Sequence, residues 1–250
     1  MGQHGKHRTL VKAARILAAL ALAAVTAVAT AAGARAECRL ALVLALDVSS
    51  SVDQREYDLQ KLGLATALNS IEVRTALLHG IGGHVELTVY EWSGRYQQEI
   101  VLEWTRLDTP AAIDHAVSVI AQAQRSHSRF PTAIGYALGY GAMLLQRGPA
   151  CKRQVIDVSG DGVNNEGFGP DLAYRNFPMK DVTVNGLVIL GADSEVLPFY
   201  RREVRRGPGA FVETARGFED FAAAMTRKLW RELNDVMVGG DYALPEDGQG

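Results

Sequence analysis

The chain has 250 residues, 48% of them hydrophobic, and it contains two cysteines. That length is enough for one α/β domain with a sizeable core, so a second domain is not required. Five of the 26 basic residues and none of the 28 acidic ones lie in residues 1–36, which leaves a net charge of −7 on the remainder and makes nucleic acid a disfavoured partner.

The first 36 residues have the order of a secretory signal peptide. A basic segment without acidic residues is followed by an apolar run at residues 16–32 and by Ala34-Arg35-Ala36, an A-x-A cleavage site. The alternative is an uncleaved membrane anchor, but the run has only 17 residues and is rich in alanine. We therefore expect cleavage after Ala36, no stable membrane span in the mature protein, and a periplasmic or secreted location.

The residues that follow alternate strand patterns with helix patterns. Residues 40–46 form a near-continuous apolar run, which is typical of a strand buried on both faces of a parallel sheet. A capping box at Asp53 and Glu56 predicts a helix that continues to about residue 79. The further predicted elements are strands at residues 84–92 and 97–104, helices at 110–124 and from 132 onwards, a strand at 153–159, a short helix at 171–176, a strand at 183–190, a helix at 196–205, a strand at 210–214 and a helix at 219–236.

This order predicts an α/β fold with a doubly wound, mostly parallel six-stranded sheet and helices on both faces. The strands at 84–92 and 97–104 are joined by a short turn, so we expect a hairpin that supplies one antiparallel edge strand. We expect a single domain at residues 37–238. The polar residues 239–250 are predicted to be a disordered tail.

Oxygen-bearing side chains gather where strands of the predicted sheet end. Asp47, Ser49 and Ser51 follow the first strand, Thr132 opens a helix after a polar loop, and Asp161 follows the strand at 153–159. In wound sheets, ligands bind at the carboxyl ends of the strands. Two carboxylates and three hydroxyls are hard donors that suit Mg²⁺, Mn²⁺ or Ca²⁺ and are poor for zinc or copper.

Asp47-x-Ser49-x-Ser51 after a buried strand, a threonine in a second loop and Asp161-Gly162 in a third resemble the von Willebrand factor A (vWA) domain and its metal-ion-dependent adhesion site (MIDAS). The resemblance extends over about residues 39–235 and is greatest to exported bacterial members. It implies that Ser49, Ser51 and Thr132 touch the metal, while Asp47 and Asp161 act directly or through water. It also implies an open coordination position for a carboxylate from a partner protein.

Two loops depart from the family pattern. Thr132 follows Phe130-Pro131, where the family usually has glycine, and the third loop reads Ser159-Gly160-Asp161-Gly162, which is one residue longer than usual. Asp157 within the preceding strand is also unusual, because a buried carboxylate needs a hydrogen bond or a charge partner. Its role is left open between a partner of a metal ligand, an alternative ligand and an ordinary hydrogen-bonded or ion-paired carboxylate.

The resemblance also implies a disulfide. In the strand order of the family, the strands that follow Cys38 and Cys151 are parallel neighbours, so both cysteines would lie at the edge opposite the metal. An exported domain in an oxidising compartment permits such a bond. We therefore expect Cys38 and Cys151 to be joined.

Of three candidate functions we expect the first, a binding module that is not an enzyme, and keep the other two as alternatives. The first is a secreted module that binds an Asp or Glu side chain of a protein ligand through a divalent cation. The second is a metal-dependent hydrolase or phosphoryl-transfer enzyme, although Ser49 stands where phosphatases carry a second aspartate, and neither a nucleophile elbow nor a Walker loop is present in the sequence. The third is a metal-free scaffold. The sequence leaves the oligomeric state open.

Overall fold

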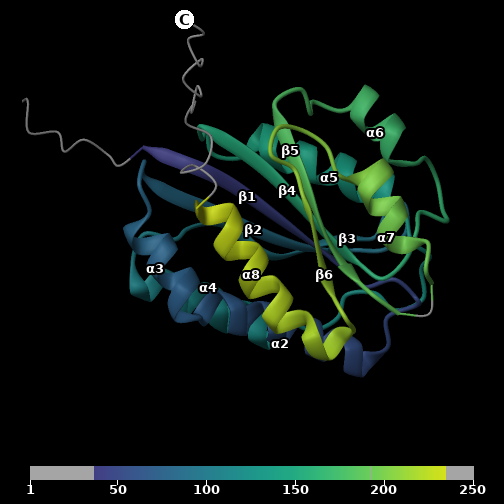
Figure 1. Ribbon diagram of the computed structural model, residues 1–250, viewed down its shortest axis with the longest axis horizontal. Coiled ribbons are helices and arrows are strands. Elements are labelled where there is room, and N and C mark those ends of the chain that lie inside the picture. Colours follow the sequence, from purple (N-terminus) through teal and green to yellow (C-terminus); the bar gives the residue numbers. More distant parts are fainter. Residues whose placement is uncertain (1–36, 192, 235–250) are drawn as a thin grey trace, which may run out of the picture. The chain divides into compact units, whose positions relative to one another are not determined.

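The computed structural model describes residues 37–191 and 193–234 (Figure 1). The predicted signal peptide, residues 1–36, and the predicted tail, residues 239–250, lie outside the described residues. Within the described part of the chain, no helix combines the length and the apolar character needed to cross a bilayer.

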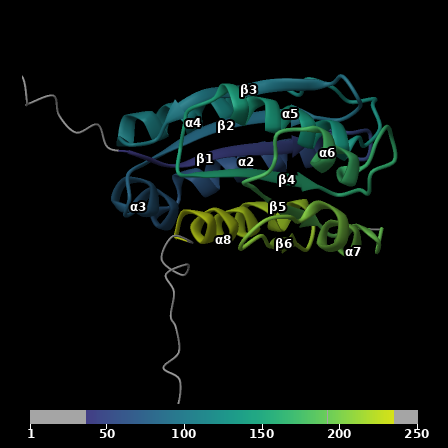
Figure 2. The same cartoon turned by 90° about the horizontal axis from the view of Figure 1, so that it is seen from above.

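A six-stranded sheet forms the centre of the fold, in the order β3-β2-β1-β4-β5-β6 (Figure 2). Only β2 and β3 pair antiparallel; the other neighbours are parallel. The predicted doubly wound sheet with one antiparallel edge strand is therefore confirmed. The strands are β1 (Cys38–Asp47), β2 (His84–Trp92), β3 (Gln98–Arg106), β4 (Arg153–Gly160), β5 (Val182–Ile189) and β6 (Val212–Ala215).

Helices cover both faces of this sheet (Figure 1). On one face lie α2 (Gln54–Asn69), α3 (Ile71–His79), α4 (Pro110–Gln122) and α8 (Phe221–Asn234). On the other face lie α5 (Ile134–Arg147), α6 (Pro170–Asn176) and α7 (Val196–Phe199), which continues into a π-helical turn at Tyr200–Val204. A short 3₁₀ turn at Phe218–Asp220 leads into α8.

β1 divides the core into two layers because its side chains alternate between the faces. Its even-numbered residues, Leu40 to Leu46, pack with the layer of α2 and α8, whereas Ala41, Val43 and Ala45 pack with the layer of α5. All ten residues of β1 are buried, as the continuous apolar run predicts. The alternation assigns Asp47, the last residue of β1, to the α5 side.

One segment that was predicted as a single helix forms two helices in the structure. The pattern at residues 53–79 predicts a continuous helix, but the structure ends α2 at Asn69 and starts α3 at Ile71. Ser70 adopts an extended conformation between them, and its Oγ accepts a hydrogen bond from Val73 N at 3.3 Å. Ile71, which fits the apolar spacing of the first helix, is 82% exposed. The capping serine explains the break.

The other boundaries that lie within the described residues differ from the predicted ones by two residues or fewer, with one exception in type. Residues 235–236, at the end of the last predicted helix, lie outside the described residues. The segment predicted as a helix at 196–205 is α-helical only for Val196–Phe199 and π-helical for Tyr200–Val204. π-Helical turns are rare, and they are frequently found at functional sites. This one places Tyr200 against the end of β4, where its ring lies close to Gly160 and Gly186.

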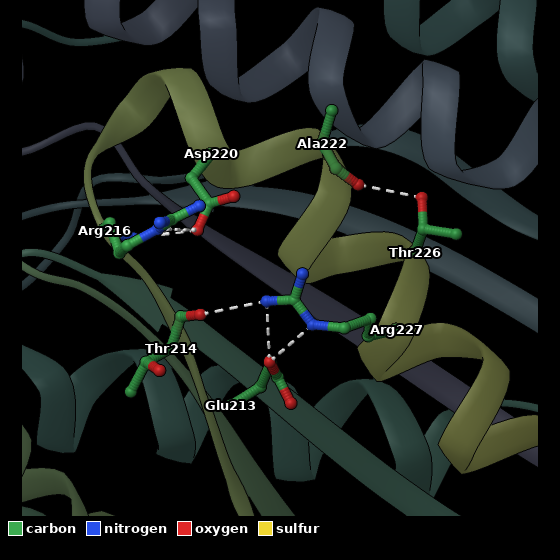
Figure 3. A network of polar contacts seen from close by, with 7 residues as sticks. All are labelled: Glu213, Thr214, Arg216, Asp220, Ala222, Thr226 and Arg227. Carbon is green, nitrogen blue, oxygen red and sulfur yellow. Dashed lines mark hydrogen bonds and ion pairs between the residues drawn. The ribbon is translucent and has the colours of Figure 1, made fainter.

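The corner between β6 and α8 is held by surface ion pairs (Figure 3). Arg227 of α8 donates from Nε and Nη2 to Glu213 Oε1 of β6, at 3.0 and 2.9 Å, and from Nη2 to the Thr214 carbonyl at 3.3 Å. In the connecting turn, Arg216 N donates to Asp220 Oδ2 at 3.1 Å. These contacts hold α8 to the edge strand and order the turn that precedes the helix.

A disulfide joins Cys38 and Cys151, whose Cα atoms are 4.6 Å apart. The bond links the start of β1 to the residues just before β4. Beside it, Lys152 N donates a hydrogen bond to the Cys38 carbonyl at 3.1 Å. Because β1 and β4 are parallel neighbours, the disulfide lies at the amino ends of these strands, whereas Asp47 lies at the carboxyl end of β1.

Candidate metal site

Asp47 ends β1 with a fully buried carboxylate. Its Oδ1 accepts a hydrogen bond from Ser49 N at 2.8 Å, which turns the chain sharply after the strand. Its main-chain carbonyl accepts one from Gln60 Nε2 of α2 at 2.9 Å. Its Oδ2 is buried and has no hydrogen-bond partner among the described residues. A buried carboxylate oxygen without a partner is costly, so this atom is suited to bind a cation or water.

The other predicted site residues form a continuous chain of oxygen atoms. Thr132 Oγ1 lies 3.3 Å from Ser49 Oγ, which lies 3.1 Å from Ser51 Oγ. Ser51 Oγ in turn donates to Asp161 Oδ1 at 2.7 Å. The structure therefore brings together all five predicted site residues, from three loops, at the carboxyl ends of β1 and β4.

The electrostatics of the site favour a cation. Burial, followed by the nearby charge of Asp161, raises the pKa of Asp47 to about 7. Burial also raises the pKa of Asp161. Both pKa shifts arise mainly because burial disfavours the ionised carboxylates, and the positive charge of Arg125 offsets only part of the shift of Asp47. A bound divalent cation would neutralise the two aspartates, while the neutral hydroxyls would complete its shell.

The donor types of the site set the metal class. Within the described ranges, no group of three or more His, Cys, Asp and Glu side chains is placed to hold a metal ion. The candidate site has only two carboxylates and relies on hydroxyls for the rest. This set fits a hard cation such as Mg²⁺, and it lacks the nitrogen and sulfur donors that favour zinc.

Arg125 holds the first loop from outside, a role that the sequence did not reveal. Its Nη2 lies within hydrogen-bond distance of three main-chain carbonyls, those of Val48 at 3.0 Å, Ser49 at 2.9 Å and Val52 at 2.6 Å. Charged donors make the stronger kind of hydrogen bond. The guanidinium therefore fixes the turn that carries two of the hydroxyls.

Two asparagines fix the second loop. Asn165 Oδ1 accepts from Thr132 N at 2.8 Å, and Asn164 Oδ1 accepts from Gly135 N at 3.3 Å. The residue at the helix cap of α5 is Ala133, whose side chain has no polar atom, so Asn164 supplies the missing acceptor from another loop. Adjacent asparagines before a predicted helix were the only signal for this role in the sequence.

The two roles at the metal site considered for Asp157 are wrong. Asp157 lies on the α8 face of the sheet, whereas Asp47 lies on the α5 face. Asp157 Oδ2 is 2.8 Å from Lys228 Nζ, and both side chains are buried. Lys228 also contacts Glu232 Oε1 at 2.8 Å. The lysine that pairs with Asp157 comes from α8, about 70 residues later, and no local pattern links the two.

Comparisons with known proteins agree with this fold. A family model described as "Protein of unknown function (DUF1194)" matches residues 37–237. Among solved structures, a von Willebrand factor type A protein from Catenulispora acidiphila is similar at a TM-score of 0.56 and 17% identity, over 80% of this chain and 43% of that one. No curated protein matches the sequence.

Two further solved structures are similar. Proximal thread matrix protein 1 from the mussel byssus, solved with a zinc-occupied MIDAS motif, has a TM-score of 0.57 and 16% identity, over 80% of this chain and 48% of that one. The PilB minor pilin from Streptococcus sanguinis has a TM-score of 0.58 and 12% identity, over 82% and 64%. The chain thus spans less than two thirds of each of these proteins, and identities this low show the fold alone. That fold is the vWA fold, as the resemblance implies.

Proposed function

The chain belongs to the DUF1194 family of proteins of unknown function, and from this premise, its vWA fold and its cluster of oxygen donors we propose that it is a metal-dependent protein-binding module. The proposal depends mainly on one observation: Thr132, Ser49, Ser51 and Asp161 form a continuous chain of oxygen atoms beside Asp47, whose buried Oδ2 has no hydrogen-bond partner among the described residues. Asp47, Ser49, Ser51, Thr132 and Asp161 would hold the cation. We propose Mg²⁺, with Mn²⁺ or Ca²⁺ as alternatives.

The partner in this proposal is a protein that presents Asp or Glu. A cation held by two carboxylates and three neutral hydroxyls keeps enough Lewis acidity to attract a carboxylate from outside. Ser51 is exposed, so the site is open on that side. The mussel byssus protein, which has a similar fold, was solved with a zinc-occupied MIDAS motif, and this supports the proposal of a divalent cation.

The proposed location is the periplasm or the cell exterior, after cleavage of residues 1–36. The disulfide supports this location, because such bonds persist in oxidising compartments and are rare in the cytosol. The domain boundaries, 37–238 for the domain and 239–250 for a polar tail, are part of the same proposal.

The test is calorimetric titration of the purified protein with Mg²⁺, Mn²⁺ and Ca²⁺. We expect saturable binding by the wild type and at least a tenfold weaker affinity in Asp47→Asn, because the substitution removes one of the two charges that neutralise the cation, a loss worth more than about 1.4 kcal/mol. Asp157→Asn is the matched control. It makes the same change to a buried aspartate on the opposite face and should leave the metal affinity unchanged.

Metal binding that is equal in wild type and Asp47→Asn would contradict the assignment of the site. Absence of binding with all three cations would leave the metal-free scaffold as the better description. Turnover of generic phosphoesters in Mg²⁺, lost in Asp47→Asn, would instead identify an enzyme.

A further inference from the structure

Large aromatic side chains stand on the loops around the candidate metal site. Tyr96, in the turn between β2 and β3, is 81% exposed, and Phe130, in the loop before α5, is 37% exposed. Neither belongs to either of the two core clusters formed by the described residues. Aromatic area that is exposed beside a binding site is typical of a surface that contacts a partner.

Each of the two exposed rings contacts a neighbouring ring. Phe130 lies edge-on to His127, with ring centroids 5.4 Å apart. Tyr96 lies edge-on to Tyr136 of α5, with ring centroids 6.0 Å apart, and Tyr136 stacks on Phe168 at 4.1 Å. An ion pair of 3.3 Å between Arg95 Nε and Glu166 Oε1 ties the turn that carries Tyr96 to the loop after β4. We call Tyr96, Phe130, Tyr136 and Phe168 the aromatic rim.

The aromatic rim and the oxygen donors share the same loops. The Phe130 carbonyl accepts a hydrogen bond from Ser50 N at 2.8 Å, so Phe130 lies directly beside the turn that carries the serine hydroxyls. Tyr136 lies four residues beyond Thr132, in the first turn of α5. A ligand whose carboxylate reaches the metal position would therefore bring its neighbouring side chains onto the rim.

The charge around the site also favours an acidic segment. Arg129, next to Phe130, is exposed and adds positive charge to the loop that carries Phe130, whereas the charge of Arg95 is paired with Glu166. Complementary charge selects the partner and excludes basic ones. Apolar rings and positive charge on the loops beside the candidate metal site thus favour a partner that has an acid group with an apolar surface beside it.

We propose that the site recognises peptide segments in which an aromatic residue stands next to the metal-binding Asp or Glu. This inference rests on the function proposed above and adds the specificity that the aromatic rim supplies. The acid group provides the anchor, and the adjacent aromatic side chain packs against Tyr96 and Phe130. Pre-arranged rings of this kind bind with little loss of side-chain freedom.

The experiment uses three blocked peptides, Ac-Gly-Phe-Asp-Gly-NH₂, Ac-Gly-Ser-Asp-Gly-NH₂ and Ac-Gly-Phe-Asn-Gly-NH₂, titrated into the purified protein with Mg²⁺ and followed by NMR chemical shifts. We expect the Phe-Asp peptide to bind about three- to tenfold more tightly than the Ser-Asp peptide, the range that an added aromatic contact gives. The Phe-Asn peptide should not bind. In Tyr96→Ser/Phe130→Ser, the preference for Phe-Asp should fall to about one, with Mg²⁺ affinity unchanged.

Trp230→Ser is the matched control. Trp230 lies on α8 and is 52% exposed, so its loss removes an exposed aromatic side chain without touching the rim, and the preference should persist. If Mg²⁺ binds but the two acidic peptides bind equally or not at all, the aromatic preference is wrong and the metal site stands. If Mg²⁺ itself does not bind, the proposed function fails, and this inference fails with it.

Discussion

At the scale of single residues, the added glycine in the third loop has a packing reason. A side chain at Gly160 would place its Cβ 2.6 Å from Tyr200 Oη and 2.8 Å from Asp47 Oδ2. Both oxygens are buried, and neither has a hydrogen-bond partner in the described part of the chain. The residue that makes this loop longer than the family pattern is thus the one that leaves space for the candidate metal ligand.

Gly160→Ala should therefore destabilise the protein. The new methyl group cannot fit without moving Asp47 or Tyr200, and overpacking of a rigid interior costs about 1–3 kcal/mol. Urea unfolding in the absence of added metal measures the loss. Gly162→Ala is the control, because its Cβ would lie 3.5 Å from Thr132 Oγ1, an ordinary contact, and should change the free energy of unfolding by less than about 0.5 kcal/mol. Equal effects of the two substitutions would refute the packing argument.

The sequence predicted the donors of the site better than their supports. Asp47, Ser49 and Ser51 follow a recognisable strand at fixed spacing, so their convergence with the later loops could be expected from the fold. Arg125 lies in a polar loop where an arginine that binds three carbonyls looks like any exposed one. Its role depends on contacts across more than 70 residues of sequence, which no local pattern encodes.

At the scale of elements, α8 is joined to the sheet by a buried polar cluster. Lys228 Nζ lies 2.8 Å from Asp157 Oδ2 of β4 and 2.8 Å from Glu232 Oε1 of its own helix. Asn185 Nδ2 of β5 donates to the same Glu232 oxygen at 2.7 Å. The ring of Phe211 lies 4.6 Å from Lys228 Nζ. One ammonium group thus compensates two buried carboxylates.

Lys228→Met should lower the free energy of unfolding by about 3–5 kcal/mol, because it leaves both carboxylates buried without their cation. Asp157→Asn should cost far less, since one carboxylate and the lysine still pair. Denaturant unfolding at pH 7 compares the two variants. A loss in Lys228→Met of less than about 1 kcal/mol would contradict the role assigned to the cluster.

The difference in free energy of unfolding between the wild type and Asp157→Asn should depend on pH. Burial is the main cause that raises the pKa of Asp157 to about 7, with the neighbouring Glu232 adding to it against the opposing effect of Lys228. A carboxyl group with a raised pKa binds its proton more tightly in the folded state, so its stabilising contribution is present below about pH 4 and is lost as the pH rises through about 7. Wild type should lose stability relative to Asp157→Asn over that interval.

The elements themselves were mostly predictable, and the exceptions have local causes. Strong periodicity located the strands and long helices. The break at Ser70 was missed because the helical spacing continues through Ile71, although the residue is a good N-cap. The π-helical turn at Tyr200–Val204 was not predicted, and Tyr200 within it lies close to Gly160 of β4 and Gly186 of β5, contacts that no local sequence pattern encodes.

At the scale of the whole molecule, the candidate metal site and the disulfide lie at opposite ends of the strands of the sheet. From β1 the chain winds to β2 and β3 on one side, and from β4 to β5 and β6 on the other. The switch between β1 and β4 collects the candidate metal ligands at the carboxyl ends of the strands. The amino ends of the same two strands carry the disulfide. A single pair of strands therefore organises both the site and the covalent link.

Reduction of the disulfide should destabilise the whole fold without dismantling the site. The bond links residues 113 positions apart, and closing a loop of that length is worth about 4–5 kcal/mol in the chain-entropy model. The unfolding midpoint of the wild type should fall when a reductant is added, whereas that of Cys151→Ser should be lower from the start and insensitive to the reductant. Because the cysteines lie at the opposite end of the strands from Asp47, the Mg²⁺ affinity of the folded, reduced protein should match that of the oxidised form. An unfolding midpoint that does not respond to the reductant would contradict the stabilising role of the disulfide. A Mg²⁺ affinity that falls on reduction would show that the metal site depends on the disulfide at the other end of the strands.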